Sequence, residues 1–448
     1  MSDITNELEA KMSNGKWPEK LADIKDLEAK IMGEDWRKEP YTVEEIESRL
    51  TNINAMVRAR WALEYSYNPT VEQVDRGLND TDPMVRSAWI QRIGSEASQY
   101  PLDRWLSNKN VDVRVGIAQL AELRPTPEQV AMGLKDRSVE VRAAWSQRAD
   151  FTPTPKQIER GLTDKSSQVR RIWIGRTDII LNPEQIERAL TDKDSDVRQK
   201  CAQRTDFTPT PEQIERGLTD HMVQVELAWV RRPGFTPTPE QVERGLDSGY
   251  ADIRQAWAER KDFTPTPQQV EQGLTDKVES IRKVWAKRID FTPTPEQIER
   301  GLTDKGYIVR QAWAERMDYV PTSEQVERGL NDSLWMIRET WAQRKDIAFT
   351  SEQTERGLTD ERDSVRIEWA KHTDFNPTAE QIARGVADEN PAVVITWINR
   401  SDIVWTEEQI QEGLKHSNKD IQEAWAQLQH RQYQLKDDAS DSMLSHGM

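Results

Sequence analysis

Residues 291–318 read FTPTPEQIERGLTDKGYIVRQAWAERMD, and variants of this stretch fill most of the chain. Fourteen copies begin at residues 39, 67, 95, 123, 151, 179, 207, 235, 263, 291, 319, 347, 375 and 403, and the last copy ends at residue 430. Successive copies start 28 residues apart, so they account for 14 × 28 = 392 of the 448 residues. A fixed period of this length indicates one repeat array over residues 39–430. Positions within each copy are numbered 1 to 28 below.

Each copy predicts a first short helix after position 4. Thr294 is followed directly by Pro295 and, three residues after the threonine, by Gln297. A capping threonine, a proline at the first helical position and a glutamine at the third are typical of a helix start. Ile298 and Leu302 then lie one turn apart on one face of that helix.

A second short helix follows in the same copy. Val309 and Trp313, at positions 19 and 23, again share one helical face. We expect Asp304, at position 14, to cap this second helix. Because the prolines at positions 3 and 5 would interrupt a continuous helix, a coiled coil is excluded. The L-x-x-L-x-L strand pattern of leucine-rich repeats is absent as well.

Glycine recurs at position 11 in eleven copies, for example Gly77, Gly133, Gly161 and Gly217. Glycine costs helix stability relative to alanine. Its recurrence therefore suggests that a neighbouring backbone passes close to the helix there, or that the helix ends there.

Tryptophan occupies position 23 in twelve copies, and Ile117 and Cys201 occupy it in the other two. A row of indoles could serve as a stacking platform for bases. We instead predict a buried column that joins successive repeats, because valine or isoleucine four residues earlier places each indole on the apolar face. The twelve are Trp61, Trp89, Trp145, Trp173, Trp229, Trp257, Trp285, Trp313, Trp341, Trp369, Trp397 and Trp425.

Helices this short are unstable alone in water, so the repeats must stack on one another. The predicted fold class is therefore all-α, an α-solenoid formed as a superhelical array of fourteen two-helix repeats.

The run D-x-x-x-x-V-R-x-A-W-x-x-R, as in Asp136–Arg148 and Asp304–Arg316, resembles the leucine-rich repeat variant family and, more loosely, HEAT-like repeats. The resemblance covers residues 39–430 and implies a right-handed superhelix of short helices that binds partners. The 28-residue period is longer than that of the variant repeats, and tryptophan replaces their small aliphatic residue. A cysteine-rich N-terminal cluster is missing, so no iron–sulfur cluster is implied.

The two ends depart from the period. Leu21, Ile24, Leu27 and Ile31 have helical spacing, so we expect residues 1–38 to form an N-terminal helical cap on the first repeat. Residues 431–448 are polar, and we expect a disordered tail there.

The composition is acidic and polar. The net charge is −16, 31% of the residues are charged, and the mean hydropathy is −0.83. These values and the lack of a secretory leader predict a soluble cytoplasmic protein that does not bind membranes. The negative charge also disfavours non-specific binding to nucleic acid.

No sequence pattern for catalysis or cofactor binding is present. The phosphate-binding, dinucleotide-binding, hydrolase and zinc-protease motifs are all absent. The five histidines are scattered, and the single cysteine, Cys201, stands in a tryptophan position, which predicts a buried inert thiol. We therefore predict no catalytic residue, no cofactor and no metal site, and an enzyme of unrecognised type stays as an alternative.

Charged residues recur with the same period. Arginine stands at position 20 in eleven copies and at position 26 in ten, while aspartate stands at position 14 in ten and at position 28 in nine. Such arginines could line a groove for a polyanion. We favour arginine–aspartate pairing between adjacent repeats, because each recurring arginine has a recurring aspartate available.

Most variation between copies falls at positions 15 to 18, in the turn between the two helices. This turn is polar in several copies but apolar or aromatic across five consecutive ones. Exposed apolar residues of these types favour interfaces. We therefore predict a partner-binding surface, called the turn ridge below, made of Met222, Val223, Tyr250, Val278, Tyr307, Ile308, Leu334, Trp335 and Met336.

The function expected from these features is that of a non-enzymatic scaffold. It would bind a macromolecular partner, most plausibly a protein, through the turn ridge or the concave face of the array. The acidic, evenly spread charge leaves open a second reading, in which the chain imitates DNA or engages nucleic acid as some HEAT-like proteins do.

Overall fold

A computed structural model describes residues 41–95, 102–121 and 123–445, and within these residues every regular element is a helix. The chain divides into two compact units, residues 1–232 and 233–448. The boundary falls in the stretch Arg231–Gly234, where the sequence departs from the repeat. The helical cap expected over residues 1–38 lies outside the described residues.

Odd-numbered helices are the first helices of their repeats, and even-numbered helices are the second. The first unit contains α3 (Val43–Leu50), α4 (Ala55–Ala62), α5 (Val71–Leu78), α6 (Pro83–Ser95), α7 (Leu102–Leu106), α8 (Val111–Gln119), α9 (Pro127–Gly133), α10 (Val139–Gln147), α11 (Pro155–Leu162), α12 (Ser167–Gly175), α13 (Pro183–Leu190), α14 (Ser195–Ala202), α15 (Pro211–Leu218) and α16 (Val223–Val230).

The second unit continues the same alternation. It contains α17 (Pro239–Leu246), α18 (Ala251–Glu259), α19 (Pro267–Leu274), α20 (Glu279–Ala286), α21 (Pro295–Leu302), α22 (Tyr307–Ala314), α23 (Ser323–Leu330), α24 (Trp335–Ala342), α25 (Ser351–Leu358), α26 (Asp363–Lys371), α27 (Ala379–Val386), α28 (Pro391–Ile398), α29 (Glu407–Gly413) and α30 (Lys419–Ser445).

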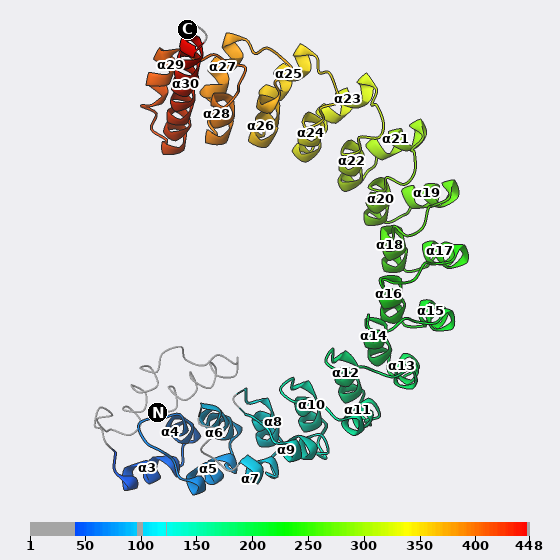
Figure 1. Ribbon diagram of the computed structural model, residues 1–448, viewed down its shortest axis with the longest axis vertical. Coiled ribbons are helices and arrows are strands. Elements are labelled where there is room, and N and C mark those ends of the chain that lie inside the picture. Colours follow the sequence, from blue (N-terminus) through cyan, green and yellow to red (C-terminus); the bar gives the residue numbers. More distant parts are fainter. Residues whose placement is uncertain (1–40, 96–101, 122, 446–448) are drawn as a thin grey trace. The chain divides into compact units, whose positions relative to one another are not determined.

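Within each unit the helices form two rows (Figure 1). Each first helix packs on the second helix of its own repeat, and each second helix packs closely on the second helix of the next repeat. First helices of neighbouring repeats touch each other much less. The row of second helices is thus the continuous support of each unit, which confirms the predicted all-α solenoid.

The predicted starts of the first helices are confirmed. In α21 the Thr294 side chain accepts a hydrogen bond from the backbone N–H of Gln297, and the Gln297 side chain accepts one from the backbone N–H of Thr294. This reciprocal capping box satisfies two N–H groups that a helix start otherwise leaves unpaired.

The expected cap of the second helices was placed two residues too early. In α22 the N-cap is Gly306, at position 16, and the carboxylate of Asp304 accepts the backbone N–H of Gly306 at 2.7 Å. The aspartate at position 14 therefore shapes the turn that leads into the helix. The N-cap position itself is free to hold other side chains.

All twelve tryptophans at position 23 are buried, with 4% or less of their surface exposed. This confirms the predicted burial of the column and leaves no accessible face for stacking bases. Each indole lies mainly against the first helix of its own repeat, and Trp173 also reaches the preceding repeat, where its Nε1 donates to Ser146 Oγ at 2.8 Å. The column thus joins the two rows of helices.

The position-11 glycine makes room for that indole. A Cβ atom on Gly301 would lie only 2.1 Å from Nε1 of Trp313, so no larger residue fits without a shift. The close neighbour is therefore a tryptophan side chain and not a backbone, and the other expectation, a helix end, nearly holds, because α21 ends at Leu302, one residue after this glycine. The eleven pairs are Gly77–Trp89, Gly133–Trp145, Gly161–Trp173, Gly217–Trp229, Gly245–Trp257, Gly273–Trp285, Gly301–Trp313, Gly329–Trp341, Gly357–Trp369, Gly385–Trp397 and Gly413–Trp425.

The last helix is longer than expected. Helix α30 begins at Lys419 and continues to Ser445, so its backbone is helical through most of residues 431–448, where we expected disorder. The Trp425 ring in this helix packs edge-on against Trp405 with centroids 4.8 Å apart.

Candidate functional site

The arginines at position 20 join successive repeats. Nε and Nη2 of Arg282 bind the two carboxylate oxygens of Asp304 at 2.7 Å each, and Nη1 donates to the carbonyl of Asp276 at 2.8 Å. The guanidinium thus ties the turn of its own repeat to that of the next.

Ten arginines make this bond to the aspartate 22 residues ahead, and we call the set the position-20 ladder. Its pairs are Arg58–Asp80, Arg114–Asp136, Arg142–Asp164, Arg170–Asp192, Arg198–Asp220, Arg254–Asp276, Arg282–Asp304, Arg310–Asp332, Arg338–Asp360 and Arg366–Asp388. The predicted pairing is confirmed here. These guanidinium groups are occupied and nearly buried, which argues against a groove for a polyanion along them.

The ladder perturbs the acidity of its members. Burial raises the pKa of Asp304, but the hydrogen bonds from Arg282 and from the Gly306 N–H outweigh it, and the net pKa lies below its usual value. The hydrogen bonds that Arg282 donates to Asp304 in turn raise the pKa of Arg282. The Arg282–Asp304 pair is therefore held in its charged form.

The arginines at position 26 have a different role. Nη1 of Arg316 donates to the carbonyls of Ala286 and Arg288, at 2.8 and 2.5 Å, in the preceding repeat. Ala286 is the last residue of α20 and Arg288 follows it by two, so these carbonyls lie at the C-terminal end of the helix, where backbone carbonyls are left unpaired. The aspartate partner, Asp318, belongs to the same repeat as Arg316, so the expected pairing across repeats is wrong at this position.

The turn-ridge residues lie at the N-terminal ends of second helices. Met222, Tyr250, Val278 and Leu334 are the N-caps of α16, α18, α20 and α24, and within the described chain none of them accepts a capping hydrogen bond through its side chain. Other copies place a polar residue there, as Ser138 does for α10.

The ridge is only partly exposed. Tyr250 and Tyr307 are 58% and 42% exposed, and the other seven residues are half-buried. Trp335 lies under the guanidinium of Arg362, 5.1 Å from the ring centroid. The structure brings the seven ridge residues of the second unit to the N-terminal ends of the successive helices α18, α20, α22 and α24. Met222 and Val223 belong to the first unit.

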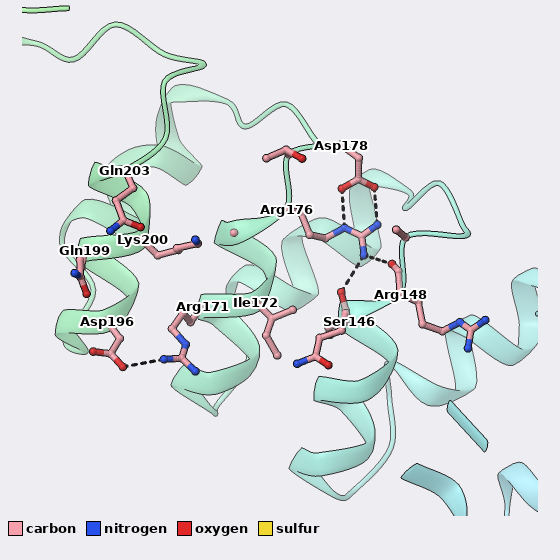
Figure 2. Close-up of a pocket in the computed structure, with 14 residues that line it drawn as sticks. Ser146, Arg148, Arg171, Ile172, Arg176, Asp178, Asp196, Gln199, Lys200 and Gln203 are labelled. Carbon is pink, nitrogen blue, oxygen red and sulfur yellow. Dashed lines mark hydrogen bonds and ion pairs between the residues drawn. The ribbon is translucent and has the colours of Figure 1, made fainter. Parts of the chain in front are cut away.

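Sequence reasoning did not single out a second feature, a hollow of about 650 Å³ on the second helices of the first unit (Figure 2). It is centred on Gly175, at position 25, between α10, α12 and α14. The sequence does contain a signal for this hollow. Gly175 stands between copies that carry Gln147 and Gln203 at the same position, so one copy lacks a long side chain there.

The remaining residues that could take part in catalysis or metal binding, Cys201 and His372, have structural roles instead. Cys201 is fully buried, as predicted, and burial raises the pKa of its thiol to about 12. His372 stands at position 26 in place of arginine, and its Nδ1 lies 3.2 Å from a carboxylate oxygen of Asp374. Among the described residues, no three histidine, cysteine, aspartate or glutamate side chains gather in a way that could hold a metal ion. No helix in that part of the chain combines the length and apolar character needed to cross a membrane.

Comparisons with known proteins support the repeat architecture. Residues 66–91, which span most of one copy, match the model of a HEAT repeat associated with sister chromatid cohesion. A comparison with curated proteins finds no match.

Two solved structures are similar in outline. One, described as a leucine-rich repeat variant with a novel repetitive structural motif, is 20% identical, with 54% of this chain and 88% of that chain covered and a TM-score of 0.38. The other, described by the binding of Kap95p to RanGDP, is 11% identical, with 95% of this chain and 64% of that chain covered and the same TM-score. The family match covers about one copy, and together with the two-helix form of that copy it supports a HEAT-like repeat there.

Proposed function

We propose that this chain is a non-enzymatic cytoplasmic scaffold that binds a protein partner through the turn ridge. The observation that carries the proposal is the apolar or aromatic N-cap of four second helices, namely Met222, Tyr250, Val278 and Leu334. Replacing a capping residue with an apolar one costs a helix about 1 kcal/mol. A run of such losses needs a compensating use for the apolar side chains.

The ridge residues at these caps and at the helix starts that follow them are suited to an interface. Tyrosine, tryptophan and methionine are favoured at the centres of protein interfaces, where a few large side chains carry most of the binding energy. Tyr307 is accessible, and Trp335 presents a ring already held against Arg362. The ridge thus offers anchors on rigid helix ends, which lowers the entropy lost on binding.

The ion pairs of the position-20 ladder argue against the alternative in which the chain imitates DNA. A mimic needs carboxylates that are free to present negative charge. Asp304 and the nine other ladder aspartates are each neutralised by an arginine at hydrogen-bonding distance. The negative charge that remains is spread over many exposed glutamates.

The test is a pull-down from an extract of the source cells, with the full chain as bait. The Tyr307→Ala/Trp335→Ala double variant should lose the main retained protein, and the purified partner should bind the variant at least about ten-fold more weakly. A matched control is Ile289→Ala/Met317→Ala, because these side chains are 86% and 59% exposed but lie outside the ridge in the same unit.

Two outcomes contradict the proposal. In the first, both double variants retain the same partners as the unmodified chain. In the second, the bait retains DNA in a salt-sensitive manner, which favours the nucleic-acid reading. Thermal unfolding of each variant shows whether a loss of binding reflects a loss of fold.

A further inference from the structure

The hollow at Gly175 exists because one repeat lacks a side chain that its neighbours have. Gln147 ends α10 and Gln203 follows α14, whereas α12 ends in Gly175. A Cβ atom on Gly175 would lie 2.9 Å from Cε of Lys200, so a longer side chain would displace the lysine and fill the space.

The lining of the hollow is more basic than the chain that surrounds it. It contains Arg148, Arg171, Arg176 and Lys200 against Asp178 and Asp196, which gives 4 − 2 = +2 in a chain of net charge −16. The volume of about 650 Å³ lies within the range of roughly 300–1,000 Å³ that ligand sites have.

Most of these cations already have carboxylate partners. Arg148 binds Asp150 at 2.5 Å, Arg176 binds Asp178 at 2.6 Å, and Arg171 binds Asp196 through one contact of 3.1 Å. The Arg171–Asp196 pair is about half exposed, so it contributes little and can rearrange.

Lys200 differs from the other three cations. Among the described residues its ammonium group makes no ion pair, and in Figure 2 its side chain extends from α14 across the hollow toward α12. Lys200 and Arg171 are therefore the groups that can receive an incoming negative charge.

The hollow is the middle of a longer groove. A neighbouring depression of about 550 Å³ shares Gln147 and Arg148 with it, and another of about 250 Å³ shares Lys200 and Gln203. The groove follows the C-terminal ends of α8, α10, α12 and α14, and exposed glutamine amides line it on either side of Gly175. A glutamine amide can both donate to and accept from a peptide backbone.

The spacing of the groove suits an extended chain. Packed helices lie roughly 8–10 Å apart, and three residues of a polyproline II helix advance about 9.3 Å. Every third residue of such a peptide would therefore face the next repeat.

We propose that this groove binds an extended acidic segment of a protein. One carboxylate sits in the Gly175 hollow between Lys200 and Arg171, and the side-chain amides of Gln147 and Gln203 bond to the peptide backbone on either side. A peptide fits better than a nucleic acid, because a peptide can place a single carboxylate at the one unpaired ammonium, whereas a nucleic acid would bring a row of phosphates against the aspartates of the groove.

The site is tested by fluorescence anisotropy with the full chain and a labelled proline-rich peptide that carries one Pro-Pro-Glu triplet. The matching Pro-Pro-Gln peptide should bind about ten-fold more weakly, because it cannot form the charged hydrogen bonds. Lys200→Glu and Gly175→Gln should each weaken binding of the Pro-Pro-Glu peptide to a similar extent.

Lys165→Glu is the matched control, since it makes the same charge change on an exposed turn residue of the first unit outside the groove. It should leave the affinity unchanged, and thermal unfolding should be alike for all variants. The proposal is overturned if the Pro-Pro-Glu peptide does not bind, if the glutamate and glutamine peptides bind equally, or if Lys165→Glu weakens binding as much as Lys200→Glu. It is also overturned if labelled single-stranded DNA binds in place of the peptide and is lost with Lys200→Glu.

The groove does not depend on the turn ridge. Its variants lie in the first unit and leave Tyr307 and Trp335 intact. Failure of either proposal therefore leaves the other standing.

Discussion

A glycine inside a helix costs about 1 kcal/mol relative to alanine, so a glycine at the same helical position of eleven repeats needs a physical reason. The structure supplies it at Gly301, where the Trp313 indole occupies the place of a side chain. The repeat that has Cys201 in place of tryptophan has Ala189 in place of glycine. The two positions therefore act as a matched pair, in which the glycine accommodates a large buried ring.

We predict that Gly301→Ala lowers the free energy of unfolding by about 1–3 kcal/mol, because the new Cβ overlaps the indole. Helix propensity alone predicts a change of about 1 kcal/mol in the opposite direction. Urea unfolding measures the difference. Gly249→Ala is the control, since no described heavy atom lies within 4 Å of a Cβ there, and it should be nearly neutral. If Gly301→Ala stabilises the protein, the indole is not what requires the glycine.

The Arg282–Asp304 bond makes a prediction with a defined pH dependence. At neutral pH we expect Asp304→Asn to cost about 1.5–3 kcal/mol, the usual range for hydrogen bonds to charged groups. The folded pKa of Asp304 lies below its usual value of 3.8. Such a carboxyl stabilises the fold above its unfolded pKa, and that stabilisation is lost as the pH falls through the lower folded pKa. The difference between wild type and Asp304→Asn should therefore shrink below about pH 4 in urea titrations.

An exposed ion pair in the same unit provides the comparison. Arg300 binds Glu271 at 2.7 Å, but the two side chains are 42% and 48% exposed. Arg300→Met should cost less than about 1 kcal/mol, because water and salt screen the pair. Equal losses from Arg300→Met and Asp304→Asn would mean that burial does not set the strength of the ladder.

At the scale of the helices, the N-cap of α18 should reveal a conflict between stability and binding. Tyr250 occupies this cap without a side-chain hydrogen bond, whereas Ser138 caps α10 by accepting from the N–H of Val141. Tyr250→Ser should raise the free energy of unfolding by about 0.5–1 kcal/mol while it weakens partner binding. Ser138→Ala should lower stability by about 1 kcal/mol. A loss of stability in Tyr250→Ser would show that the tyrosine packs structurally and does not belong to the ridge.

Both helices of each repeat could be predicted from the sequence because their signals are local. Thr294, Pro295 and Gln297 lie within one turn and define the start of α21 by themselves. The contacts that sequence reasoning misplaced depend on side-chain directions. The indole beside Gly301 comes from a residue twelve positions later, and the carbonyls that bind Arg316 come from the preceding repeat. Such partners become visible only when the helices are packed.

At the scale of the molecule, the period predicted which repeats touch but not what they bind. Buried positions are nearly alike in every copy, so they describe the scaffold and carry little information about a ligand. The turn ridge was found because five consecutive copies depart from the pattern. The Gly175 hollow depends on one residue that departs from the repeat, the glycine at position 25. It could be proposed as a binding site only when the structure placed Lys200 next to the space that the missing side chain leaves.

Among the described helices, those that pack closely belong to the same copy or to adjacent copies, so one whole copy should be removable. Deletion of residues 263–290 brings the repeats on either side together in register, so that Arg254 can bind Asp304 and Arg316 can bind the carbonyls that α18 offers. If each copy is stabilised only by its neighbours, the variant that lacks residues 263–290 should keep the helix content per residue of the wild type and unfold at a modestly lower temperature. Deletion of residues 263–276 removes α19 alone and leaves the buried face of α20 uncovered, so it should abolish cooperative unfolding. Equal damage from the two deletions, measured by circular dichroism, would contradict a fold assembled from interchangeable units.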